Sequence, residues 1–151
     1  MSRDIINLQG GGSLNILKDY SIWIGEHIFK SVEDVQREMY TAYQIVYSMD
    51  QLTEIAYGIK NNVDVLWYLD PAHDAARMRQ IRLGLESNLN VSIYAKPVYV
   101  SKQMNEIRLG LSEGLNVSVY AKSEIPWDIM KSIRESMNEG LDVSEIMDIL
   151  K

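Results

Sequence analysis

Two stretches of the sequence are nearly identical and lie 26 residues apart: MRQIRLGLESNLNVSIYAK begins at Met78, and MNEIRLGLSEGLNVSVYAK begins at Met104. Of the 26 residues that start at each of these methionines, 13 are the same. The register extends to weaker copies that begin at Leu52 and Met130, so four units fill residues 52–151 and the last is truncated. Self-similarity at a fixed period of about 20 to 50 residues is the signature of a repeat array. The sequence therefore predicts a mainly α fold, a short α-solenoid-like array of four helical units.

Within each unit the apolar spacing is helical. Met104, Ile107, Leu111 and Leu115 fall on one stripe of a helix, and Gly114 supplies the residue at which such a helix stops. A residue that favours the N-cap position follows two positions later and predicts a second, short helix. These residues are Asp64, Asn90, Asn116 and Asp142. Each unit is therefore expected to be a helix, a tight turn, a short helix and a loop.

The first fifty residues lie outside the repeats. The string YSIWIGEHIF alternates apolar and polar residues, which predicts a β-hairpin. Ser31 is a good N-cap for a helix expected to run to about Met49, with its apolar face formed by Val32, Val35, Met39, Tyr43 and Val46. We expect this helix to cap the array, because terminal repeats cannot leave a stacking face in water. The predicted organisation is a hairpin and capping helix in residues 1–50, followed by the array in 51–151.

Composition weighs against several classes of function. The chain has no cysteine, and its two histidines, His27 and His73, have no second ligand at helical spacing. We therefore expect both histidines to be ordinary surface residues, and we expect no catalytic residue, metal or cofactor. A net charge of −6 disfavours generic nucleic-acid binding. No apolar run approaches the roughly 20 residues that a membrane span needs, and the N-terminus lacks the apolar core of a secretory signal. The sequence therefore predicts a cytoplasmic protein.

Arginine recurs in register at Arg82, Arg108 and Arg134, and Ala56 stands at this position in the first unit. Its methylenes can cover the core while the guanidinium emerges at the edge of the helix. One interpretation is an inter-repeat ladder, in which each arginine bonds C-terminal carbonyls or an acidic neighbour in the next unit. The other is a row that binds anions or a partner.

Tyrosine and glycine also recur in register. Tyrosine stands at residues 68, 94 and 120, and Ile146 replaces it in the last unit, which favours core packing. Glycine stands at residues 58, 84 and 110, inside the predicted helices, where it lowers helix propensity by about 1 kcal/mol relative to alanine. The recurrence of glycine predicts a close approach between the helices of adjacent units.

A third column is the candidate binding site. Tyr57, Leu83 and Leu109 project roughly opposite the main apolar stripe, on a face that also carries Glu106 and Glu113. An apolar strip with a polar rim is typical of an interaction site. The alternative is that another part of the protein covers the strip.

The string QMNEIRLGLSEGLNVSVYAK resembles a repeat found in proteins of phages, plasmids and conjugative elements of clostridia and other Firmicutes. The resemblance covers residues 52–151 and is most specific in the middle two units. It implies a protein of a phage or mobile genetic element, and no reaction or catalytic residue. We therefore expect a non-catalytic protein–protein interaction module that inhibits a host defence nuclease in the manner of an anti-CRISPR. The alternative is a nucleic-acid-binding or regulatory accessory protein that uses the arginine ladder.

Overall fold

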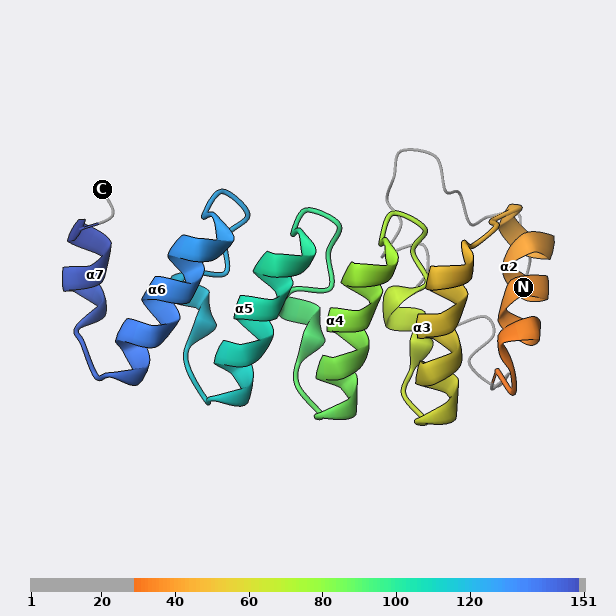
Figure 1. Cartoon of the computed structure of the whole chain (residues 1–151), viewed down its shortest axis with the longest axis horizontal. Coiled ribbons are helices and arrows are strands. Elements are labelled where there is room, and N and C mark those ends of the chain that lie inside the picture. The colour runs from red at the N-terminus through yellow and green to blue at the C-terminus, as the bar shows by residue number, and fades with distance from the viewer. Residues whose placement is uncertain (1–28, 150–151) are drawn as a thin grey trace. The chain divides into compact units, whose positions relative to one another are not determined.

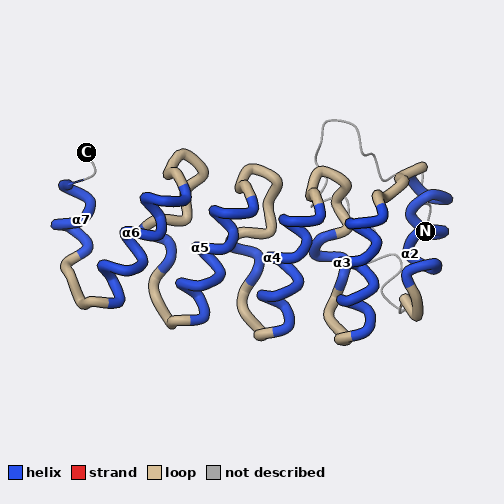
Figure 2. Tube along the Cα trace, viewed as in Figure 1, coloured by secondary structure: helices blue, strands red, loops and turns tan. Residues whose placement is uncertain are grey.

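The structure is a computed structural model that describes residues 29–149. Within this range the chain is mainly helical and contains no strand (Figures 1 and 2). The mainly α prediction is confirmed. The predicted β-hairpin lies outside the described residues. No helix in the described range combines the length and the apolar content needed to cross a membrane.

The 26-residue register is exact in the helices. Four α-helices of 12 residues each begin 26 residues apart: α3 (Met49–Lys60), α4 (Ala75–Glu86), α5 (Ser101–Ser112) and α6 (Trp127–Asn138). Each is followed by a short helix that keeps the same spacing: η3 (Val65–Tyr68), η4 (Val91–Ile93), η5 (Val117–Val119) and α7 (Val143–Ile149). Figure 1 shows the tight turn that joins each pair. By compactness the chain also divides into two larger parts, which we name compact units: the first compact unit ends at Arg82, and the second compact unit begins at Leu83.

The helix that precedes the repeats is shorter than predicted. Helix α2 spans Val32–Tyr43, and the Ser31 side chain caps it as expected by accepting a hydrogen bond from the Asp34 amide. It ends because Gln44 adopts a left-handed conformation with φ of 59°. A new capping box at Ser48 and Gln51 then starts α3, which packs on α2. The expected continuous helix to Met49 is therefore wrong.

The turns inside the repeats form as predicted. Gly114 has φ of +74°, and the Leu115 amide donates to the Gly110 carbonyl at 2.9 Å, which closes the C-terminus of α5. Asn88 occupies the equivalent position with φ of 57°. The Asn116 side chain then accepts from the Ser118 amide and starts η5. Asp64, Asn90 and Asp142 accept the equivalent amide hydrogen bonds.

The recurrent tyrosines are buried, and they explain the recurrent glycines. Tyr120 is fully buried, and its Oη donates to the Glu106 carbonyl oxygen at 2.7 Å. A Cβ built on Gly110 would lie 2.0 Å from this Oη. The corresponding distances are 1.9 Å for the pair at 58 and 68, and 2.1 Å for the pair at 84 and 94. The glycines therefore admit a tyrosine of their own repeat, and the predicted approach between helices of adjacent units is not their reason.

The buried face of α5 is rotated from the predicted stripe. Met104 and Ile107 are fully buried as expected, but Leu111 is only partly buried. The buried face instead includes Gln103 and Glu106, which are 5% and 4% exposed. Polar side chains thus occupy part of the buried face, and Glu106 does so against the prediction, because each finds a hydrogen-bond partner.

Candidate partner-binding surface

The three apolar residues of the predicted strip differ in exposure. Tyr57 is 47% exposed, and the Arg82 guanidinium lies over its ring at 5.1 Å from the centroid. Leu83 and Leu109 are partly buried. A cation over a ring face adds about 0.5–1 kcal/mol at exposed sites. The role of these residues in binding stays a prediction, with Tyr57 the most accessible of the three.

The acidic part of the predicted face has a structural role. Arg134 Nε donates to Glu106 Oε1 at 3.2 Å, and its Nη1 donates to the two carboxylate oxygens of Glu113 at 2.9 and 3.1 Å. Burial alone would lower the pKa of Arg134, but hydrogen bonds and charges from Glu113 and Glu106 raise it above its ordinary value. Glu106 is buried, so the expectation that it lies on an exposed face is wrong. Glu113 remains exposed beside this pair.

The arginine ladder connects repeats. Arg82 Nε donates to Glu54 Oε2 at 2.9 Å, 28 residues earlier in the chain, which is the same separation as between Arg134 and Glu106. Arg108 bonds Asn105 within its own helix at 2.9 Å. Arg82 and Arg134 therefore connect adjacent repeats, with the carboxylate in the preceding repeat and not in the next one as expected. Their guanidiniums hold carboxylates, which leaves the row that would bind anions without support at these two positions.

A further repeated feature lies in the loops before the α-helices. We name as pre-helix segments the residues between each helix and the next α-helix, together with the first residue of that α-helix: 44–49, 69–75, 94–101 and 120–127. Exposed large apolar side chains gather there, at Val46, Met49, Val98, Val100 and Trp127. Val46 and Val98 are two periods apart, and Met49 and Trp127 are three. The same part of the repeat is thus exposed in both compact units.

In the second compact unit, two side chains join pre-helix segments 94–101 and 120–127. Gln103 Oε1 accepts from the Val100 amide at 3.0 Å, and Gln103 Nε2 donates to the Ile125 carbonyl at 2.7 Å. Tyr99 Oη donates to the Ala121 carbonyl at 2.8 Å. Because Gln103 is 5% exposed, these bonds form away from water and fix one segment against the other.

The joined segments carry a mixed apolar and cationic surface, which we name the lysine–tryptophan surface. Val98, Val100 and Trp127 are 58%, 46% and 38% exposed. Lys102 is exposed, and its Nζ lies 4.8 Å from the centroid of the Trp127 ring. The surface thus consists of Val98, Val100, Lys102 and Trp127. Large apolar side chains beside a cation suit protein recognition better than chemistry.

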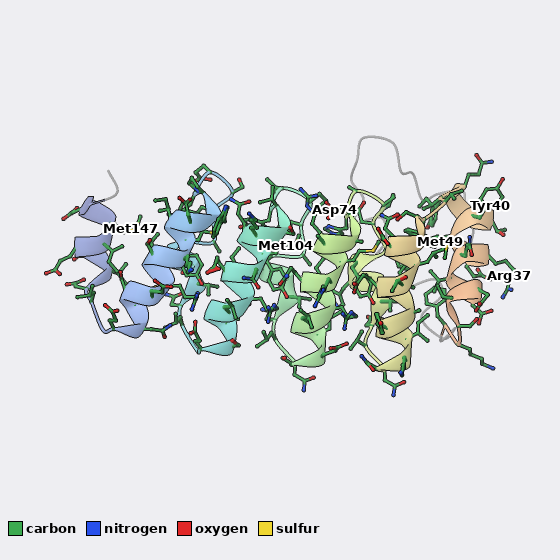
Figure 3. The ribbon with its side chains drawn as sticks, viewed as in Figure 1. Arg37, Tyr40, Met49, Asp74, Met104 and Met147 are labelled. Atoms are coloured by element: carbon green, nitrogen blue, oxygen red, sulfur yellow. The ribbon has the colours of Figure 1, made fainter. Side chains whose placement is uncertain are left out.

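The first compact unit has the same joint, made by a glutamine and a tyrosine two periods earlier in the chain. Gln51 Nε2 donates to the His73 carbonyl at 2.8 Å, and Tyr47 Oη donates to the Leu69 carbonyl. An open groove of about 510 Å³ lies here, lined by Ser48, Asp50, Gln51, Pro71, Ala72, Asp74, Ala75 and Ala76. Figure 3 shows Met49 at the start of α3 and Asp74 just before α4. Small and acidic residues therefore line the groove, in contrast to the lysine–tryptophan surface.

His73 is the one histidine in the described residues and is fully buried. Neither ring nitrogen has a hydrogen-bond partner among the described residues, and the same is true of Asp70 Oδ2. Burial lowers the pKa of His73, against a smaller opposing effect of Asp70. Tyrosine stands at this position one period earlier and one period later, at 47 and 99. His73 is therefore a core residue, and the expectation that it lies on the surface is wrong.

Sequence reasoning missed Gln103, Tyr99 and Trp127, and the sequence carries a signal for the first two. Gln51 and Gln103 are 52 residues apart, as are Tyr47 and Tyr99. A search at one period overlooks these pairs because the unit between them carries other residues. A search at two periods would have found both. The exposure of Trp127 has no such signal.

Comparisons with protein-family models, curated proteins and solved structures found no match to this chain.

Proposed function

We propose that the protein is a non-catalytic, protein-binding module built as an α-solenoid-like array, and that it inhibits a bacterial defence nuclease in the manner of an anti-CRISPR. The host protein meets it in the bacterial cytoplasm. The observation that carries the proposal is the gathering of exposed apolar side chains on the pre-helix segments. Exposed apolar groups with polar rims are typical of surfaces that bind other proteins.

The contacts inside the repeats support the proposal, because the residues that stabilise the fold are not the exposed apolar ones. The first three repeats use a tyrosine, a glycine and an N-cap residue to stabilise themselves, while the pre-helix segments also carry apolar side chains that are exposed. Val98 and Trp127 are examples, at 58% and 38% exposed. A repeat protein of this kind presents several small surfaces whose residues can vary without disturbing the core. The inhibitory step rests on the resemblance to repeats of mobile elements.

The test is inhibition of purified effector nucleases. The protein is added to a panel of CRISPR nuclease complexes, and DNA cleavage and co-elution in size-exclusion chromatography are measured. A stable complex with loss of cleavage for at least one effector is the expected result. A protein that neither co-elutes with nor inhibits any effector of the panel, and does not restore phage plaques on strains that carry them, contradicts the inhibitor proposal.

The predicted strip is tested in the same assays with Leu83→Glu combined with Leu109→Glu. If the strip contacts the partner, the double variant loses binding while its melting temperature stays near that of the wild type. If the two leucines belong to the core, the double variant unfolds, because a buried unpaired charge costs several kcal/mol. Because Tyr57 is 47% exposed, Tyr57→Ala should disturb the fold least among substitutions in the strip.

A further inference from the structure

We propose that the lysine–tryptophan surface binds an acidic segment of a partner protein, one in which aliphatic or aromatic side chains alternate with carboxylates. This inference rests on the proposed function only in that the chain binds a protein. It names the chemistry of the bound segment, whatever the partner's identity.

The surface is preformed. Val100 lies one residue before α5, and its amide is held by Gln103, which also holds the Ile125 carbonyl two residues before Trp127. Tyr99 adds the bond to Ala121. Binding to a surface that is already ordered loses less conformational entropy than binding to a loop that must fold first.

The apolar side chains supply the anchoring contacts. Val98 and Val100 are about half exposed, and Trp127 is 38% exposed with Lys102 over its ring. Tryptophan is enriched among the residues that contribute most binding energy in protein interfaces. Leucine, tryptophan or phenylalanine side chains of a bound segment would remove these groups from water.

The charge around these side chains selects an acidic segment. The stretch from Ser87 to Asn105 contains Lys96 and Lys102 and no acidic residue, in a chain whose net charge is −6. Both lysines are exposed, and neither forms an ion pair with another described residue. Complementary charge across an interface raises association rate and specificity. Carboxylates of the bound segment would meet these two ammonium groups.

Two other occupants fit less well. In a two-fold dimer built on this surface, the same lysines of both copies would face one another, which is unfavourable. An anionic bilayer is an extended surface, so the net charge of −6 of the whole chain would repel it. A short peptide interacts mainly with the charges within a Debye length of about 10 Å. Exposed carboxylates at Glu124 and Asp128 flank Trp127, so the acidic groups of a bound segment are expected at the stretch that carries Lys96 and Lys102, whereas an extended anionic surface would meet these carboxylates as well.

The probe is a fluorescein-labelled synthetic peptide made of three Glu-Leu-Glu-Trp units. Two matched peptides serve as controls, one with lysine in place of every glutamate and one with serine in place of every leucine and tryptophan. Fluorescence anisotropy with the full chain is expected to show binding of the acidic apolar peptide at least about tenfold tighter than of either control. The affinity should fall as NaCl rises from about 50 to 300 mM, because salt screens exposed charges.

The repeats themselves supply variants that the fold accepts. Val98→Ala combined with Val100→Asp introduces the residues found one period earlier, at Ala72 and Asp74. Lys102→Asp introduces the residue found two periods earlier and one period later. Each variant is expected to weaken binding of the acidic peptide at least about tenfold with an unchanged melting temperature. Met49→Ala, at an exposed position of the first unit, is the matched control and should bind like the wild type.

Several outcomes overturn the inference. These are equal binding of the three peptides, no binding of the acidic apolar peptide, retention of binding by Val98→Ala/Val100→Asp and Lys102→Asp, a concentration-dependent dimer that these variants abolish, or binding to phosphatidylglycerol vesicles in place of the peptide. The cleavage assay separates this inference from the inhibitor proposal. Peptide binding at this surface without nuclease inhibition supports the inference and contradicts the inhibitor proposal. Nuclease inhibition that both variants retain supports the inhibitor proposal and contradicts the inference that this surface binds the partner.

Discussion

Substitution of Gly110 by alanine sets two opposing effects against each other within α5. In a helix interior alanine is more favourable than glycine by about 1 kcal/mol, so propensity alone predicts a stabilised protein. The structure predicts the reverse. A Cβ at this position would lie 2.0 Å from Tyr120 Oη and 2.7 Å from Val117 Cγ1, and both of these side chains are buried.

The cost can be worked out from these contacts. Insertion of a methyl group into a packed core costs about 1–3 kcal/mol. Displacement of the Tyr120 ring also breaks its 2.7 Å bond to the Glu106 carbonyl, and loss of a buried hydrogen bond costs about 1–3 kcal/mol. After the gain in helix propensity is subtracted, Gly110→Ala should lower the free energy of unfolding by about 1–5 kcal/mol.

Urea denaturation followed by circular dichroism measures this loss. In a Tyr120→Phe background the nearest clashing atom is gone and Cζ remains at 3.2 Å, so Gly110→Ala should cost at least about 1 kcal/mol less there. The matched control is Ser136→Ala, one period later, where Ile146 replaces the tyrosine; it should change stability by less than about 0.5 kcal/mol. If Gly110→Ala is as stable as the wild type, or loses the same free energy in both backgrounds, the contact between the glycine and the tyrosine is not what excludes a side chain.

Three further predictions concern buried groups. Arg134→Met should cost about 3–5 kcal/mol in urea denaturation, because it leaves the Glu106 carboxylate, with 5% of its side chain exposed, without its guanidinium; a loss below about 1 kcal/mol would contradict this reasoning. Because burial lowers the pKa of His73, the unfolded chain takes up a proton first as the pH falls below about 6.5, so the melting temperature should drop between about pH 7.5 and 5.5. In that window His73→Tyr, which introduces the residue that both neighbouring repeats carry, should flatten the drop, and equal slopes for the two proteins would refute it. Ile107→Ala should cost about 2–5 kcal/mol and Leu111→Ala less, because only Ile107 is fully buried, and the opposite order would mean that the buried face is the one the helical wheel predicts.

The sequence was sufficient to predict the elements whose causes are local. The period is exact in the helices, and Gly114 and Asn116 adopt the turn and cap roles expected of them, because each acts through its own backbone and nearest neighbours. The same locality explains why Ser31 caps α2 as predicted. What a residue does within a single turn of chain can be inferred without knowing what packs against it.

Features that depend on distant partners were not predictable in this way. A helical wheel assigned Glu106 to the surface, but Arg134, 28 residues later, holds it inside. The wheel also carried the α2 helix through Gln44, whose side chain gives no sign of the left-handed conformation that ends the helix there. The lysine–tryptophan surface escaped notice because the exposure of Trp127 depends on how α5 and α6 pack, not on its spacing.

The four repeats form an alignment within one chain, and it separates residues that build the fold from residues that do not. Valine opens every short helix, and glycine accompanies tyrosine in three units; where Ile146 replaces the tyrosine, serine replaces the glycine. The two substitutions occur together because, once the Oη is gone, the space next to the helix admits a Cβ. At the exposed positions no such linkage holds, and the residues in register with Val100 are serine, aspartate and proline. Free variation at an exposed, rigidly held position leaves the fold intact while changing charge and apolarity, so each pre-helix segment can acquire its own binding chemistry. The acidic groove of the first compact unit and the lysine–tryptophan surface of the second compact unit differ because the exposed residues of the pre-helix segments vary in this way.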